Sequence, residues 1–505
     1  MYGDGMSNAR VLNPSMTQSR SVIQDERHAL DRSLVHGIAW TGAVKWGTQI
    51  LSWASTVIVA RLLTPADYGL VAMAVTFFGF VTMINEFGLG TAVITKRDLG
   101  DQQIAQLNSL AVIFGVVGFI VSCAMALPLS QFFGTSDLCW VVVVMGIGFL
   151  ITGFRTVPAA LIEKDLQFRL LAMMEGAQAL VGAFSVVALA LLGLGYWALV
   201  FGGLLSTAVW TVLTLAFRRH NFAKPLFQPL KETITFSWHL IAMRVTWYLY
   251  SNADRFIAGK MLGQAALGAY TFACTLSNVA VEKIAGLVNR VTPAVFSAVQ
   301  TEHAVLRRYL LTITEGIALI TFPVTAGLAL VADEFVLLVL GRQWTSVVAP
   351  LQLLSLYAAY NSVMTVLSPT LLATGKSRLA MLNGFWSAAL LLPAFYIGSR
   401  WGIVGIAAAW LVAYPFTTVP IYCHVFRSIG MPISRYLRTL WPAFSGTVLM
   451  AVTVVLLKRI LPTWPLPIHL GFLVLGGCAA YCLAMFTLHR ERVNAFLQLS
   501  RTLRG

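Results

Sequence analysis

The feature of this sequence that most constrains its fold is a succession of apolar runs, each about 20 residues long, between His36 and Leu488. A helix needs about 20 apolar residues to cross a bilayer. Hydrophobic residues make up 58% of the chain and charged residues 11%, whereas roughly 25% of the residues in soluble domains are charged. Strands of a membrane barrel would alternate apolar and polar side chains instead. We therefore predict an all-α polytopic membrane protein with about 14 transmembrane helices.

The apolar runs predict two groups of six helices followed by a final pair. The first group occupies residues 33–217, the second 232–425 and the pair 438–488. We expect the two groups to be tandem lobes around a central cleft. Residues 1–32 are polar and lack an apolar core, which predicts a disordered cytoplasmic tail and not a signal peptide. Residues 489–505 form a basic tail, which we also expect to be cytoplasmic.

The basic residues predict how the chain is oriented in the membrane. The net charge is +15, but the lysines and arginines cluster in short loops between apolar runs, so we expect no nucleic-acid partner. Most of the 35 fall on the side that contains both termini, including Arg155, Lys164 and Arg169, which we assign to one loop. Because cytoplasmic loops of membrane proteins carry the excess of positive charge, both termini should be cytoplasmic in a bacterial inner membrane. The six cysteines have neither zinc-binding nor disulfide spacing, and we expect no metal or cofactor.

Two halves of the chain resemble each other when one is shifted by 199 positions, which places Ile58 on Ile257. The segment from Ile58 to Gly69 then falls on the segment from Ile257 to Gly268, and a cation, an apolar pair and a glycine coincide. Six helices per copy give both copies the same orientation, so the pseudo-symmetry axis should run along the membrane normal. The alternative is that two apolar sequences align by chance.

The same shift aligns two polar stripes on helix faces. Their members recur at i, i+4, i+7 and i+11, which is one face of a helix. They are Lys45, Gln49, Ser52 and Thr56 in the first copy and Arg244, Tyr248, Ser251 and Arg255 in the second. A cation near a helix centre costs at least about 2.5 kcal/mol, so it normally faces a bundle interior or a watery cavity. We predict that Lys45, Gln49, Arg244, Tyr248, Ser251 and Arg255 line a substrate cleft; snorkelling of the cations to the membrane surface is the alternative. Lys283 is a further cation within a predicted span.

Several acidic residues also fall within predicted spans. Glu86, Asp254 and Glu282 are candidates for coupling transport to a proton or another cation. Each of them could equally form a structural ion pair. Arg255 follows Asp254 directly, and neighbouring helix positions do not face each other, so these two side chains need not pair.

Four segments resemble those of bacterial polysaccharide transporters of the Wzx type, in particular the colanic-acid and lipopolysaccharide exporter branch. The strongest is Arg61-Leu-Leu-Thr-Pro-Ala-Asp-Tyr-Gly69, and the others are Glu86-Phe-Gly-Leu-Gly90, Asp254-Arg-Phe-Ile-Ala-Gly-Lys-Met-Leu-Gly263 and Leu371-Leu-Ala-Thr-Gly-Lys376. The resemblance covers residues 33 to 488. The second copy departs from the first, since Gln264 and Ala266 stand where the first has Pro65 and Asp67.

This resemblance implies the fold of the multidrug/oligosaccharidyl-lipid/polysaccharide exporter superfamily. It also implies alternating access, in which a lipid-diphosphate-linked oligosaccharide moves to the periplasmic leaflet among membrane lipids, with the polysaccharide polymerase machinery as a further partner. On this interpretation Lys45 and Arg244 hold the anionic headgroup.

Three other functions stay open at this point. A drug or cation antiporter of the same superfamily should carry an acid in the first span, where this chain has Lys45. A lipid II flippase would share the cationic cleft and the extra helix pair. A membrane glycosyltransferase, polymerase or ligase would need catalytic loops, but the longest outer connection, around Asp333 to Ser346, is short and mostly apolar. We expect a transporter without catalytic residues.

Overall fold

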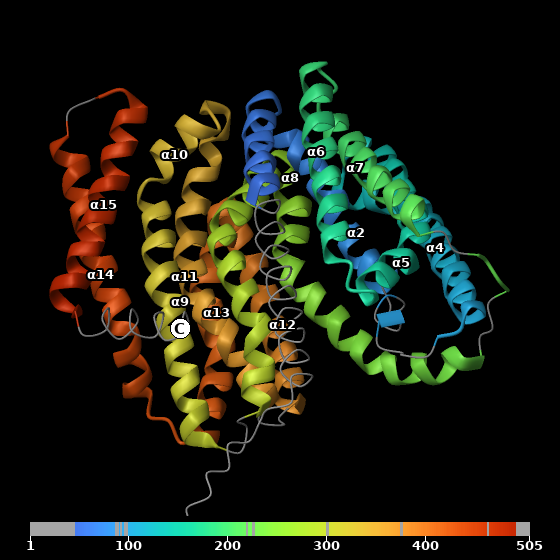
Figure 1. Ribbon diagram of the computed structural model, residues 1–505. Coiled ribbons are helices and arrows are strands. Elements are labelled where there is room, and N and C mark those ends of the chain that lie inside the picture. Colours follow the sequence, from blue (N-terminus) through green and yellow to red (C-terminus); the bar gives the residue numbers. More distant parts are fainter. Residues whose placement is uncertain are drawn as a thin grey trace, which may run out of the picture.

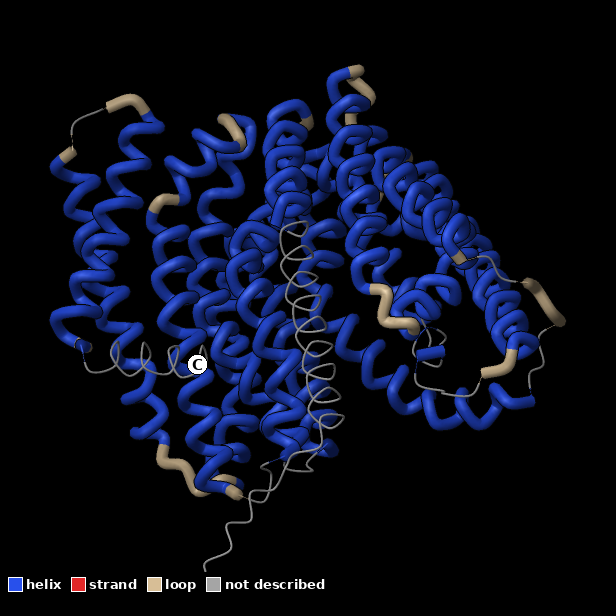
Figure 2. The backbone as a smooth tube through the Cα atoms, in the orientation of Figure 1, coloured by secondary structure: helices blue, strands red, loops and turns tan. Residues whose placement is uncertain are grey.

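The computed structural model describes residues 46–85, 90, 93–94, 99–218, 221–224, 228–298, 302–373, 377–461 and 464–490. Within these residues all regular structure is helical, and short loops join the helices (Figure 2). The helices are one over residues 46–62, α2 (Pro65–Asn85), α4 (Asp101–Phe133), α5 (Asp137–Lys164), α6 (Phe168–Leu191), α7 (Tyr196–Phe217), α8 (Gln228–Ala298), α9 (His303–Leu330), α10 (Ala332–Val339), η1 (Arg342–Val347), α11 (Val348–Ala373), α12 (Ser377–Gly398), η2 (Ser399–Trp401), α13 (Gly402–Ser428), α14 (Ile433–Ile460) and α15 (Leu466–Leu488).

The helices correspond to the predicted membrane spans. Ten stretches of the described residues are long and apolar enough to cross a bilayer, and one of them, Leu382–Ser428, contains both α12 and α13. The 71 residues of α8 form two limbs, because the backbone leaves the helical conformation at Gly263, where φ is 84°. These limbs and the helix over residues 46–62 account for the remaining predicted spans. The chain is an all-α, multi-pass membrane protein, as predicted.

The surfaces of these helices suit a lipid solvent. Large apolar side chains such as Phe184 and Leu475 are about 70% exposed, which a soluble monomer shows only in small patches. Buried hydroxyl groups donate hydrogen bonds to carbonyls of their own helix. Ser122 donates to the Gly118 carbonyl at 2.7 Å, and Thr321 donates to the Ile317 carbonyl at 2.9 Å. These two hydroxyls thus enter the apolar interior with their donors paired.

Figure 1 shows two sets of helices with α8 between them. In the first set α4 packs on α5, α6 on α7 and α5 on α7. In the second set α11 packs on α9 and α13, and α12 packs on α13. The antiparallel pair α14 and α15 packs on α9 at the edge of the molecule. The predicted division into lobes at 33–217 and 232–425 stays a prediction.

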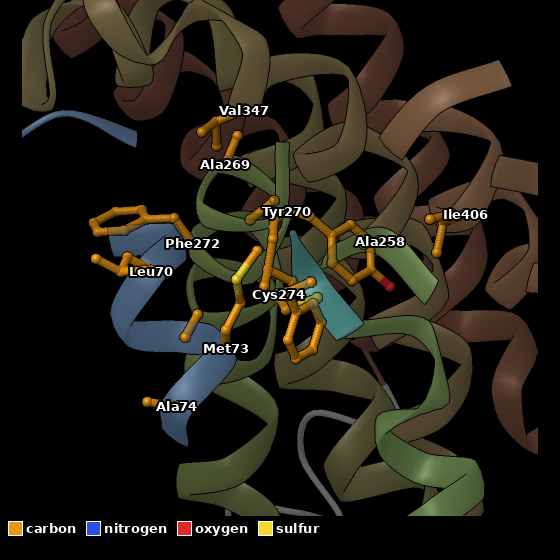
Figure 3. Packing of buried hydrophobic residues seen from close by; sticks show 14 of the residues in the cluster. Leu70, Met73, Ala74, Ala258, Ala269, Tyr270, Phe272, Cys274, Val347 and Ile406 are labelled. Atoms are coloured by element: carbon orange, nitrogen blue, oxygen red, sulfur yellow. The ribbon is translucent and has the colours of Figure 1, made fainter. Parts of the chain in front are cut away.

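The most extensive cluster of buried hydrophobic side chains among the described residues joins the two sets where α2 meets α8. Figure 3 shows Leu70 and Met73 of α2 beside Phe272 and Cys274 of α8. The Tyr68 ring lies edge-on to Phe272, with centroids 5.4 Å apart, and the same ring is 5.3 Å from Trp344 of η1. Residues from distant parts of the sequence therefore share one core, which continues to Trp410 of α13.

Candidate functional site

The structure describes some of the predicted cleft residues and not others. Lys45 and Glu86 lie outside the described residues. Arg244 belongs to the first limb of α8, but its side chain is not among those described. The geometry of the site therefore comes from the remaining predicted residues: Gln49, Tyr248, Ser251, Asp254, Arg255 and Glu282.

Gln49 meets a cation from the second limb of α8. The Lys283 ammonium donates a hydrogen bond of 2.6 Å to the Gln49 side-chain carbonyl, which joins the helix over residues 46–62 to α8. Lys283 and its neighbour Glu282 are exposed, and Gln49 is half-buried. An ammonium group has three N–H donors, and the contact with Gln49 uses one of them. Its position inside an apolar run was the sequence signal for this residue, but it lies on neither polar stripe.

The Tyr248 side chain of α8 contacts α2 and does not project into open space. Its hydroxyl donates to the Thr76 carbonyl of α2 at 2.6 Å. Gly79 makes this approach possible, since a Cβ there would collide with the Tyr248 hydroxyl. Ser251 lies half-buried one turn further along the same limb. At Tyr248 the stripe on α8 therefore faces the first half of the chain, but the Tyr248 hydroxyl already has a hydrogen-bond partner there.

Asp254 is buried at the junction of α8 and α13, with 3% of its surface exposed. One carboxylate oxygen accepts hydrogen bonds from the Tyr270 hydroxyl at 2.7 Å and the Trp410 indole N–H at 2.9 Å. The other accepts the Arg255 backbone N–H at 2.8 Å. These three hydrogen bonds satisfy the buried carboxyl group and hold it in place. The rings of Tyr357 and Phe395 pack about Trp410, with centroids within 5.0 Å, and fix the indole.

Arg255 is held by its own helix. Its Nη1 donates to the Asn252 side-chain carbonyl at 2.8 Å. Its Nε is buried and has no hydrogen-bond partner among the described residues. A guanidinium N–H donates to acceptors such as carboxylate or phosphate oxygens.

A separate cavity of about 220 Å³ lies between α2, α4, α5 and α7. Arg155 lines it together with the hydroxyls of Thr152 and Thr156, and the Arg155 guanidinium stacks 3.8 Å above the Trp210 ring. The assignment of Arg155 to a loop was wrong: α5 continues to Lys164, which places Arg155 inside a helix. Ligand pockets for even drug-sized molecules are about 300–1,000 Å³, so this cavity is too small for an oligosaccharide.

Acidic, histidine and cysteine side chains form no group able to hold a metal ion within the described part of the chain. The polar groups of the described site residues are cations, amides and hydroxyls, together with the carboxylates of Asp254 and Glu282.

Comparison with known proteins supports the helical membrane fold and shows which protein family the chain belongs to. The family described as "Polysaccharide biosynthesis protein" matches residues 58–349, more than half of the chain. An uncharacterized membrane protein in the cps region of Klebsiella pneumoniae is 24% identical, over 91% of this chain and 96% of that protein. The lipopolysaccharide biosynthesis protein WzxC of Escherichia coli strain K12 is 23% identical, over 82% of this chain and 86% of WzxC.

Among solved structures, the lipid II flippase MurJ in an inward closed conformation superimposes with a TM-score of 0.73. The match covers 90% of this chain and 99% of that one, at 11% sequence identity. At this identity the likeness shows the fold alone. The two proteins thus share one helical architecture despite almost unrelated sequences.

Proposed function

Because the chain belongs to the family of polysaccharide biosynthesis proteins, we propose that it is a flippase for a lipid-linked anionic oligosaccharide or exopolysaccharide precursor. The observation that carries this proposal is that a member of this family has the fold of a lipid II flippase over nearly its whole length. Transport takes place across the bacterial inner membrane by alternating access, with both termini in the cytoplasm. The polysaccharide polymerase machinery then receives the precursor.

The headgroup crosses between the lobes formed by residues 33–217 and 232–425. Lys45 and Arg244 hold the diphosphate, and Gln49, Ser251 and Arg255 line its path. The Lys283 ammonium, positioned by Gln49, adds a cation to this path. Moving a diphosphate through a low-dielectric region is costly unless cations and hydrogen-bond donors compensate its charge. The lipid tail stays in the bilayer throughout.

Transport is coupled to an ion through an acidic residue whose carboxylate does not already have its hydrogen-bond partners. The carboxylate of Asp254 already accepts hydrogen bonds from three donors, which supports a structural role for this residue. Glu282 is exposed and lies next to Lys283, so protonation of Glu282 would change the charge beside the proposed path. Glu86 is the other candidate.

A leaflet-accessibility assay in cells tests the proposed function. The gene is deleted in its host, and the lipid-linked intermediate is assigned to one leaflet by its access to an external lectin or glycosidase. We expect the intermediate to accumulate out of reach after deletion and to become accessible when the wild-type gene is restored. A variant with Lys45→Gln and Arg244→Gln should fail to restore access although the protein is present in the membrane.

The other outcomes of this assay distinguish the rival functions. If the intermediate reaches the outer leaflet without the protein and only later processing fails, the protein is a glycosyltransferase, polymerase or ligase. If glycans are unchanged and only drug sensitivity rises, it is a drug antiporter. Loss of cell-wall precursor transport would identify it as a lipid II flippase.

A further inference from the structure

Two cations at equivalent repeat positions cross from one half of the chain to the other. Arg61 ends the helix over residues 46–62, and its Nε donates to the Val339 carbonyl at 2.9 Å, while Nη2 donates to the Leu338 carbonyl. Lys260, which the 199-position shift places on Arg61, donates from Nζ to the Phe132 carbonyl at 2.5 Å. The arrangement is reciprocal: a cation from each half reaches a helix of the other half.

Each cation meets the carboxyl end of a helix. Leu338 and Val339 are at the end of α10, and Phe132 is at the end of α4. The last carbonyls of a helix have no partner within it, and the helix dipole places negative charge there. The cations therefore satisfy groups that would otherwise need water. The Lys260 ammonium also lies 5.0 Å from the centre of the Phe132 ring.

The same end of the molecule contains a reciprocal contact of two glycines. A Cβ on Gly69 of α2 would collide with the Gln264 carbonyl of α8, and a Cβ on Gly268 would collide with the Pro65 carbonyl. Gly69 and Gly268 are equivalent in the repeat, as are Pro65 and Gln264. The backbones of α2 and of the second limb of α8 thus touch through positions that only glycine can occupy.

Side chains of η1 complete this closed end. The Trp344 indole N–H donates to the Ala60 carbonyl at 2.7 Å, and the Gln343 amide donates to the Ala60 and Leu63 carbonyls at 2.9 and 3.0 Å. Ala60 lies in the last turn of the helix over residues 46–62, and Leu63 directly follows that helix. Ala60 and Trp344 are fully buried.

We propose that Arg61 and Lys260 form a pseudo-symmetric latch that closes this end of the path between the two halves. Both cations are exposed, and each holds carbonyls, not a buried carboxylate. When the latch opens, water solvates the released cations and carbonyls, so opening exposes no unpaired buried charge. The glycine contact lets α2 and α8 pack closely, and the hydrogen bonds of the two cations slow the separation of the two halves. This inference rests on the proposed alternating access.

The accessibility of a single reporter thiol tests the latch without any substrate. Ala60→Cys is introduced into a variant whose six native cysteines are replaced by serine or alanine, and the purified protein is placed in lipid nanodiscs. Its reaction rate with a charged maleimide measures how often the closed end opens. We expect Arg61→Gln and Lys260→Gln each to raise the rate about two- to fivefold, as loss of one helix-terminus cation implies. The double variant should react faster than either single variant.

Arg400→Gln is the matched control, because Arg400 is exposed and contacts no charged or polar group of the described residues. Arg61→Lys, which keeps the charge but loses the forked geometry, should give an intermediate rate. If Ala60→Cys does not yield monodisperse protein, Leu63→Cys, whose side chain is 2% exposed, replaces it. A double variant that reacts no faster than the Arg400→Gln control would refute the latch. That result would not contradict the proposed flippase function or its substrate class.

Discussion

At the scale of single residues, Lys283 offers the sharpest test of the proposed path. We expect Lys283→Gln to lower transport about tenfold, because an amide cannot replace a charge-assisted hydrogen bond to a phosphate, which is worth roughly 1.5–3 kcal/mol. Lys283→Arg should retain most activity. Transport is measured by the leaflet-accessibility assay, with Arg459→Gln, an exposed cation at the end of α14, as control. Equal transport by the Lys283→Gln variant and the control would remove Lys283 from the path.

The Asp254 network predicts a specific stability effect. In Asp254→Asn an amide N–H₂ or a neutral carbonyl faces the donors of Tyr270 and Trp410, so about 3 kcal/mol of unfolding free energy should be lost. The loss should be smaller in a Trp410→Phe background, because one donor has already been removed. Thermal unfolding of the four proteins in one detergent measures this coupling. Strictly additive effects would show that the contact between Asp254 and Trp410 does not stabilise the protein.

At the scale of elements, two equivalent turns use different chemistry. In the first copy Asp67 accepts hydrogen bonds from the Thr64 backbone N–H at 2.9 Å and the Thr64 hydroxyl at 2.7 Å, which fixes the start of α2. The second copy lacks these residues, and Gly263 turns the chain with φ 84° instead. The departure at Gln264 and Ala266 was visible in the sequence, but the replacement of a cap by a positive-φ glycine was not.

The glycine contact between α2 and α8 leads to a prediction about helix packing. Gly268→Ala should lower the melting temperature and raise thiol reactivity at Ala60→Cys, because the added methyl group forces α8 away from the Pro65 carbonyl. Gly316→Ala on α9 is the control, since nothing lies within 4 Å of its added Cβ. Alanine is also favoured over glycine within helices, so the control should be neutral or slightly stabilising. Identical melting temperatures for the two variants would contradict the close contact.

At the scale of the whole molecule, composition and periodicity were sufficient to predict the helical membrane fold. Each span must satisfy its backbone hydrogen bonds internally and present apolar side chains to lipid, and both demands leave a clear sequence pattern. The contacts between spans leave no such pattern. Tyr270 reaches Asp254 because the two limbs of α8 lie against each other, and Trp410 reaches it because α13 packs on α8; nothing local to either residue indicates these contacts.

The candidate site was predicted less completely for the same reason. Helical spacing predicts that Gln49 and Tyr248 lie on polar stripes, but their hydrogen-bond partners depend on how the two halves of the chain pack together. The sequence predicted Lys283 only as a cation within a span and Arg155 as a loop residue. In the structure Lys283 donates to Gln49, and Arg155 stacks on Trp210 within α5. Similarly, the short connection around Asp333 to Ser346 folds into α10 and η1, which supply the carbonyls and side chains of the closed end.

The most direct test of the central claim is transbilayer movement in a purified system. The protein is reconstituted in liposomes with a fluorescent polyprenyl-diphosphate oligosaccharide, and the fraction that an external glycosidase can cleave is followed over time. The proposed function predicts that cleavage proceeds beyond the outer-leaflet fraction only with protein present, and that Lys45→Gln with Arg244→Gln abolishes the excess. Cleavage that stops at the outer-leaflet fraction, with folded wild-type protein and a sugar matched to the host's own glycan, would contradict it.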